Sequence, residues 1–132
     1  MLVRDIMTQS PVCVTPRTRL ADAIEVMYAN DIRHLPVLDH QRLVGILSDR
    51  DLRSLWDPTA DVANRDGRIY EKPVSELMSG EPITVQAEDD IDEAIDVLVE
   101  HRIGAVPVVN AEGVLVGIVS TIDVLKAASG KL

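Results

Sequence analysis

Two short polar motifs in this sequence place a hydroxyl and a carboxylate at the end of an apolar run. Ser48 and Asp51 follow one run, and Ser120 and Asp123 follow the other with the same spacing. A carboxylate can accept hydrogen bonds from ribose hydroxyls, and a serine hydroxyl can donate to a phosphate. The same side chains can also cap the first turn of a helix. The residue types therefore leave two interpretations open at both places, a nucleotide site and helix capping.

An internal repeat covers nearly the whole sequence. Adding 71 to a position in the first half gives its counterpart in the second half, and the offset becomes 72 after one extra residue near Gly113. Counterparts include Val3 and Val74, Pro36 and Pro107, and Gly45 and Gly117. This pattern predicts two repeats, at 1–55 and 74–132, joined by an exposed linker at 56–73.

Hydrophobic patterning predicts the element order β-α-β-β-α in each repeat, an α+β arrangement within the broad α/β class. Leu20, Ala23 and Met27 have the spacing of one helix face, and Thr18 and its counterpart Asp89 are the predicted N-caps. The predicted strands are 12–14, 35–38, 43–47, 83–85, 106–109 and 115–119, and the predicted helices are 20–30, 49–55, 91–101 and 121–128. One repeat alone is too small to bury its sheet and helices well. We therefore expect a pseudo-two-fold pair with a cleft between the repeats.

The composition excludes several functions. The chain has 132 residues, a net charge of −9, only 2% aromatic residues and no Phe, which argues against binding to nucleic acid or an anionic membrane. Cys13 is the only cysteine, so we expect no disulfide and no metal site. Without a signal peptide pattern or an apolar run of about 20 residues, the sequence predicts a cytoplasmic protein. It also lacks the recognised catalytic motifs, so we expect neither an enzyme nor a cofactor.

These features together make the sequence similar to a tandem pair of cystathionine β-synthase (CBS) domains. The resemblance rests on the repeated element order, the Pro-Val pairs at 36–37 and 107–108, and Gly-x-x-Ser-x-x-Asp in both copies. Residues 32–37 and 48–53 resemble the stand-alone pairs of the acetoin-utilisation B type. We expect a stand-alone pair without the C-terminal small-molecule-binding domain that those proteins often carry.

The resemblance implies a regulatory module that binds an adenosine nucleotide between the repeats and forms a homodimer. By this likeness Asp51 and Asp123 would bind the ribose, and Ser48 and Ser120 the ribose or phosphate. Adenine would lie against apolar strand residues, although core packing alone also explains them. These residues are Val12, Val14, Leu35, Ile83, Val85 and Val106. An effector protein of unknown identity is the other expected partner.

Arg33, His34 and Arg50 match the phosphate-contact positions of the resembled family. A guanidinium can hold a phosphate with two hydrogen bonds. An imidazole adds positive charge when it is protonated, which occurs below its unperturbed pKa of about 6.5. Each residue alone is more typical of a solvated or strand-edge position, with Asp31 or Asp49 as a possible ion-pair partner. Together they favour a phosphate site.

The second repeat departs from this pattern, since Gly104, Ala105 and Ile122 occupy the corresponding positions. Residues 3–55 carry seven Arg against seven acidic residues, whereas residues 74–132 carry three basic residues against eleven acidic ones. The sequence therefore predicts two unequal sites, of which the second is weak, empty or suited to a less negative ligand. Two other functions stay open: a ligand-free interaction or oligomerisation module, and a binder of an S-adenosylmethionine-type ligand, against which the Arg residues count.

Overall fold

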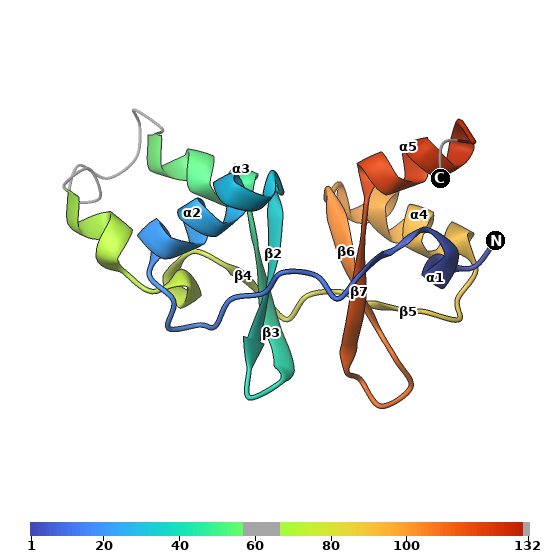
Figure 1. Cartoon of the computed structure of the whole chain (residues 1–132), viewed down its shortest axis with the longest axis horizontal. Helices are drawn as coiled ribbons and strands as arrows, with labels where there is room; N and C mark the ends of the chain where they lie inside the picture. The colour runs from blue at the N-terminus through green and yellow to red at the C-terminus, as the bar shows by residue number, and fades with distance from the viewer. Residues whose placement is uncertain (57–66, 131–132) are drawn as a thin grey trace. The chain divides into compact units, whose positions relative to one another are not determined.

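The computed structural model describes residues 1–56 and 67–130 of the chain, which forms two compact units. The first-repeat unit is Val12–Glu81, and the second-repeat unit joins Met1–Pro11 to Pro82–Leu132. Each unit contains one β-sheet whose central feature is an antiparallel hairpin, with helices packed beside it (Figure 1). The predicted mixed α+β class is confirmed.

Three antiparallel strands form the sheet of the first-repeat unit, in the order β2-β3-β4. The elements are β2 (His34–Asp39), β3 (Arg42–Ser48), β4 (Ser79–Gly80), α2 (Leu20–Asn30), α3 (Asp49–Arg53), and the 3-10 turns η1 (Ser54–Trp56), η3 (Gly67–Glu71) and η4 (Val74–Glu76). His40 and Gln41, with φ of 50° and 69°, make the tight turn of the predicted hairpin. Two consecutive left-handed residues match the twist of the strands they connect.

Four strands form the sheet of the second-repeat unit, in the order β1-β7-β6-β5, and only the β5–β6 pair is parallel. The elements are α1 (Val3–Ile6), β1 (Thr8–Gln9), β5 (Val85–Gln86), α4 (Ile91–His101), β6 (Ala105–Val109), β7 (Leu115–Ser120) and α5 (Thr121–Ala128). The longer hairpin turn is shaped by Asn110, whose side-chain oxygen accepts the backbone N–H groups of Glu112 and Val114, each at 3.0 Å. The predicted bounds of α2, α4 and α5 are confirmed at both ends.

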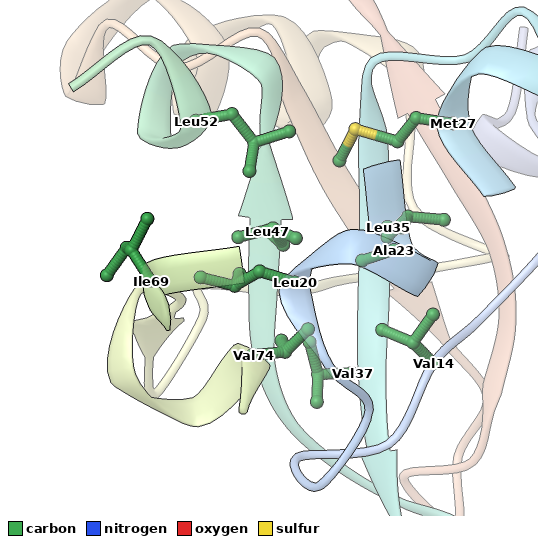
Figure 2. Packing of buried hydrophobic residues seen from close by; sticks show 10 residues of the cluster. All are labelled: Val14, Leu20, Ala23, Met27, Leu35, Val37, Leu47, Leu52, Ile69 and Val74. Carbon is green, nitrogen blue, oxygen red and sulfur yellow. The ribbon is translucent and has the colours of Figure 1, made fainter. Parts of the chain in front are cut away.

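Aliphatic side chains make the core of each unit. The core of the first-repeat unit contains Val14, Leu20, Ala23, Met27, Leu35, Val37, Leu47, Leu52, Ile69 and Val74 (Figure 2). Leu20, Leu35 and Leu47 have no exposed surface, and they come from α2, β2 and β3. The core therefore fixes the helix against both strands of the hairpin. The other unit is built in the same way from Val3, Ile6, Val85, Ala94, Leu98, Val106, Val108 and Val119.

Each core is completed by the opening segment of the other repeat. Val3 lies in the core of the second-repeat unit, and Val74 lies in the core of the first-repeat unit. Val3 N donates to the carbonyl oxygen of Asp89 at 2.8 Å, and Val74 N donates to that of Thr18 at 2.7 Å. The repeats in the sequence and the compact units therefore differ by an exchange of their opening turns.

Gly45 and Gly117 are required by the close approach of a neighbouring strand. A Cβ atom on Gly45 would lie 2.9 Å from the carbonyl oxygen of Ser79 and 2.5 Å from the sulfur of Met78. On Gly117 it would meet the carbonyl oxygen of Thr8 and the equivalent methionine sulfur at the same two distances. The short strands β4 and β1 therefore explain why each apolar run contains one glycine.

Both predicted N-caps are wrong by one residue. The N-cap of α2 is Arg19 and that of α4 is Asp90, one position after Thr18 and Asp89. The side chains of Thr18 and Asp89 instead accept the backbone N–H of the residue three positions earlier, at 3.1 and 2.8 Å. They close the turn that leads into the helix, a role that the same residue types fill as readily as capping.

The four hairpin strands extend one residue beyond the prediction at one or both ends, and three shorter elements differ more. In the predicted strand 12–14 only Val14 pairs, through one parallel bridge with Val37. Its counterpart at 83–85 is the short strand β5, which begins at Val85. The helix predicted at 49–55 ends at Arg53 and continues as η1. The errors fall where segments are too short to show a period.

The predicted linker at 56–73 is not exposed throughout. Ile69 of η3 is only 9% exposed and belongs to the core of the first-repeat unit. The backbone N–H of Leu20 donates to the carbonyl oxygen of Lys72 at 2.9 Å, which ties the end of the linker to the start of α2. Residues 57–66 of the linker lie outside the described residues.

Candidate functional site

A reciprocal pair of hydrogen bonds between Ser48 and Asp51 begins helix α3. Ser48 Oγ accepts the backbone N–H of Asp51 at 3.1 Å, and Asp51 Oδ2 accepts the backbone N–H of Ser48 at 2.8 Å. Helix capping is therefore one role of this motif. It uses only one carboxylate oxygen, because Oδ1 has no hydrogen-bond partner within the described part of the chain. A partly buried carboxylate with one unused oxygen can still accept a ribose hydroxyl.

The second motif has the same geometry. Ser120 Oγ accepts the backbone N–H of Asp123 at 3.2 Å, and Asp123 Oδ2 accepts the backbone N–H of Ser120 at 2.8 Å. The Ser120 hydroxyl also lies 3.1 Å from Asp123 Oδ2 and donates to it. The second repeat therefore has the same capping pair at the start of α5, and Oδ2 is the accepting carboxylate oxygen in both pairs.

The residues before β2 meet the start of α3 in the first-repeat unit. The backbone N–H of Asp49 donates to the carbonyl oxygen of Arg33 at 2.8 Å, and His34 pairs with Ser48 across the β2–β3 ladder. Arg50 lies in the first turn of α3. The structure thus brings these residues, which come from two separate stretches of sequence, to the same end of the hairpin, where Asp51 also lies.

Neither Arg33 nor Arg50 forms an ion pair within residues 1–56 and 67–130. Asp49 pairs instead with Arg53, with Nε and Oδ2 separated by 3.4 Å. Asp31 forms no ion pair with either residue. Both guanidinium groups are on exposed residues and are available to an anionic ligand. The spacing of the motif did not identify Asp49 as part of the candidate site, although its place directly after Ser48 in the sequence could have indicated it.

His34 is half-buried, unlike the exposed Arg33 beside it. Burial lowers the pKa of His34, because removing the imidazole from water disfavours its charged form. The carboxylates of Asp51 and Asp49 act in the opposite direction and raise this pKa, while Arg33 lowers it further. The net effect is a His34 pKa below the usual histidine value of 6.5, which favours the neutral imidazole.

The equivalent place in the second-repeat unit has the same backbone and no cation. The backbone N–H of Thr121 donates to the carbonyl oxygen of Gly104 at 3.0 Å, and Ala105 pairs with Ser120. Ala105 is 4% exposed, whereas Ile122, which replaces Arg50, is 55% exposed. This end of the hairpin therefore presents an apolar side chain where the first-repeat unit presents an arginine.

The six apolar residues predicted to contact adenine fall into two groups. Leu35 and Val106 have no exposed surface, and Val14 and Val85 are 8% and 4% exposed, so all four serve the core. The remaining two, Val12 and Ile83, are counterparts in the repeat and are 40% and 41% exposed. These two are the apolar candidates that a ligand can reach.

Within residues 1–56 and 67–130, no group of three or more His, Cys, Asp or Glu side chains is arranged to hold a metal ion. In those residues no helix has the length and apolar character needed to cross a bilayer. Each unit therefore has its own candidate site at its Ser–Asp pair, and the first-repeat unit adds basic residues to it.

Two β-α-β-β-α repeats, each with a Ser–Asp pair after a glycine-containing strand, define a tandem-repeat α+β module. The chain belongs to the CBS domain family, whose model matches residues 3–56 and 74–130. It is 34% identical over 119 residues to an inosine-5'-monophosphate dehydrogenase of Aquifex aeolicus. The match covers 89% of this chain and only 22% of that enzyme.

Solved structures of CBS proteins have the same fold. CBSX2 of Arabidopsis thaliana in complex with AMP superimposes with a TM-score of 0.82 at 32% identity, covering 98% of this chain and 96% of that chain. AcuB of Vibrio cholerae gives 0.82 at 33% identity, with coverage of 98% and 91%. The CBS domain pair of protein MJ0100, in complex with 5'-methylthioadenosine and S-adenosyl-L-methionine, gives 0.84 at 26% identity, with coverage of 100% and 98%. The resemblance inferred from the sequence is confirmed.

Proposed function

We propose that this protein is a regulatory ligand-sensing module whose first-repeat unit binds an adenosine nucleotide of the AMP, ADP or ATP class. One observation carries the proposal: Arg33 and Arg50, which form no ion pair within the described residues, share one end of a hairpin with Asp51, whose Oδ1 accepts no hydrogen bond from those residues. The guanidinium groups bind the phosphate, and Asp51 Oδ1 accepts a ribose hydroxyl. The Ser48 hydroxyl contacts the ribose or phosphate while its lone pair caps α3.

The adenine ring is assigned to the exposed apolar residue of the same unit. Val12 is 40% exposed and precedes Val14, whose backbone N–H donates to the carbonyl oxygen of Pro36 at 3.1 Å. This bond holds the segment beside β2, the strand that His34 begins. Leu35 is left to the core, since it has no exposed surface. The AMP complex of CBSX2 supports a nucleotide of this class.

Regulation follows if the ligand alters an assembly. We propose a homodimer whose conformation changes on nucleotide binding, so that its contact with an effector protein changes. A ligand does this only when it binds one conformation more tightly than the other. Sedimentation velocity and small-angle scattering, with and without saturating AMP, would detect the dimer and its change of shape.

Isothermal titration calorimetry with AMP tests the nucleotide site directly. We expect the double variant Arg33→Ala/Arg50→Ala to lose at least about 100-fold in affinity, because each hydrogen bond to a charged group contributes about 1.5–3 kcal/mol. Arg42→Ala is the matched control, since Arg42 is exposed, forms no ion pair in the described residues and lies at the other end of β3. It should bind AMP like the wild type.

Two outcomes would contradict the proposal. The first is that AMP, ADP and ATP fail to bind or stabilise the wild type, which would favour the ligand-free interaction module. The second is that Arg42→Ala, which removes one charge, loses half as much binding free energy as the double variant, which removes two; this would reduce the arginine effect to net charge. A ligand at 100 times its Kd stabilises a fold by about 2.7 kcal/mol, so thermal unfolding is a sensitive first measurement.

A second ligand class is favoured for the second-repeat unit by one observation, the replacement of Arg50 by Ile122. The Asp123 carboxylate is kept, but the cations are absent and an apolar surface takes their place. We propose that this unit accepts an adenosine compound without phosphate, of the S-adenosylmethionine or methylthioadenosine type. Competition between AMP and S-adenosylmethionine measures this, and full competition for a single site would contradict it.

A further inference from the structure

The imidazole of His34 forms no hydrogen bond or ion pair within residues 1–56 and 67–130. No buried side-chain nitrogen or oxygen in those residues lacks a hydrogen bond, so the imidazole nitrogens must reach solvent although the residue is half-buried. The accessible nitrogens of a half-buried imidazole can donate a hydrogen bond to a ligand. Because few water molecules reach such a side chain, a ligand that leaves it without a hydrogen bond binds less tightly.

Charged groups of two elements act on this imidazole. Asp49 and Asp51 face it from the start of α3, and Arg33 lies beside it before β2. The carboxylates favour the protonated form, while Arg33 and burial, the larger influence, disfavour it. These influences oppose one another, and an additional negative charge beside the imidazole favours its protonated form.

We infer that His34 takes up a proton when a phosphate group binds beside Arg33 and Arg50, so that the affinity of the first-repeat unit for adenosine phosphates rises as the pH falls. This inference rests on the proposed nucleotide site. The nucleotide affinity of the site would then depend on pH as well as on the phosphate group of the ligand. It also separates the two units, because Ala105 at the equivalent position cannot titrate.

The direction of the effect follows from linkage. Burial holds the pKa of His34 below the usual histidine value of 6.5, and a bound phosphate raises this pKa by favouring the charged imidazolium. Affinity therefore begins to rise as the pH falls through the pKa of the complex, and it levels off below the pKa of the free protein. Each pKa unit of increase on binding corresponds to a tenfold gain in affinity.

The experiment measures AMP affinity from pH 5 to 8 for the wild type and for His34→Gln, which keeps a hydrogen-bond donor of similar length. The phosphate of AMP itself titrates with a pKa of about 6, but this is common to both proteins and cancels in their ratio. We expect the ratio of wild-type to variant affinity to rise about tenfold from pH 8 to pH 5. Calorimetry in buffers of different ionisation enthalpy should show proton uptake by the wild type only.

An NMR titration of the wild type gives a second readout that needs no variant. AMP should raise the pKa of His34, whereas adenosine should leave it unchanged, and the resonances of His40 and His101 serve as internal references. If AMP binds with the same pH profile in both proteins and no change at His34, the inference is wrong while the nucleotide site stands. If AMP does not bind at any pH, both are wrong.

Discussion

The two Ser–Asp pairs of this chain have nearly the same backbone and very different surroundings. Ser48 has φ and ψ of −116° and 160°, and Ser120 has −103° and 166°. In both, the carboxylate accepts the serine N–H at 2.8 Å. The side chains around them are Arg33, His34 and Arg50 in one unit and Gly104, Ala105 and Ile122 in the other.

This contrast separates what the scaffold requires from what a ligand requires. Helix capping alone explains why both repeats have a Ser–Asp pair with the same geometry, and no ligand is needed for this. Capping does not explain two exposed arginines at one copy that form no ion pair in the part of the chain that the structure describes, nor an exposed isoleucine at the other copy. The difference between the units is therefore the better guide to function.

The glycines test the shared scaffold, with the largest expected effect. Gly45→Ala and Gly117→Ala should each lower the free energy of unfolding by about 3 kcal/mol, because the new Cβ would meet a backbone carbonyl at 2.9 Å. Gly80→Ala is the control, since nothing lies within 4 Å of its Cβ position, and it should change stability by less than about 0.5 kcal/mol. Urea unfolding measures all three. If the losses of unfolding free energy at Gly45 and Gly117 differ, the two sheets are not equivalent in how tightly they pack at these positions.

An exchange of side chains between the units tests the difference. Arg50→Ile should weaken AMP binding by about tenfold, since it removes one charged hydrogen-bond donor. Ile122→Arg should strengthen AMP binding to the second-repeat unit several-fold, because Ile122 is 55% exposed and can be replaced without disturbing the core. Calorimetry with AMP resolves the two sites.

The reciprocal design supplies its own control. Both substitutions change the net charge of the chain by one unit, in opposite directions, so the double exchange Arg50→Ile/Ile122→Arg restores the original charge. If AMP affinity follows net charge alone, the double exchange will match the wild type in every respect. A transfer of the tighter site from one unit to the other would instead show that the arginine position decides where phosphate binds.

The helices and hairpins of this fold could be predicted from the sequence because their apolar residues are periodic over many positions. The bounds of α2 were predicted at both Leu20 and Asn30. Strands β1 and β4 could not be predicted, since two residues show no period. Nor could the exchange that places Val3 in one core and Val74 in the other, because equivalent segments have equivalent patterns and either pairing satisfies them.

The site was predictable where it depends on spacing and unpredictable where it depends on exposure. The separation of three residues between Ser48 and Asp51 is visible in the sequence, and so are the basic residues nearby. The apolar pattern could not tell Val12, which is 40% exposed, from Leu35, which is fully buried. Both residues lie in short apolar stretches. Only the packing of the fold, in which Leu35 joins the core with residues of α2, decides which of the two side chains is buried.

The serines test the comparison with the smallest expected effect. Ser48→Ala and Ser120→Ala should each lower the free energy of unfolding by about 1 kcal/mol, because each removes the acceptor for one helix N–H. The two losses should be similar, since the bonds are 3.1 and 3.2 Å long. AMP affinity, in contrast, should fall only in Ser48→Ala. Equal losses of stability with unequal losses of affinity would mean that the same capping pair serves a phosphate site in one unit alone, whereas an unchanged AMP affinity in both variants would leave capping as the only role of the serine.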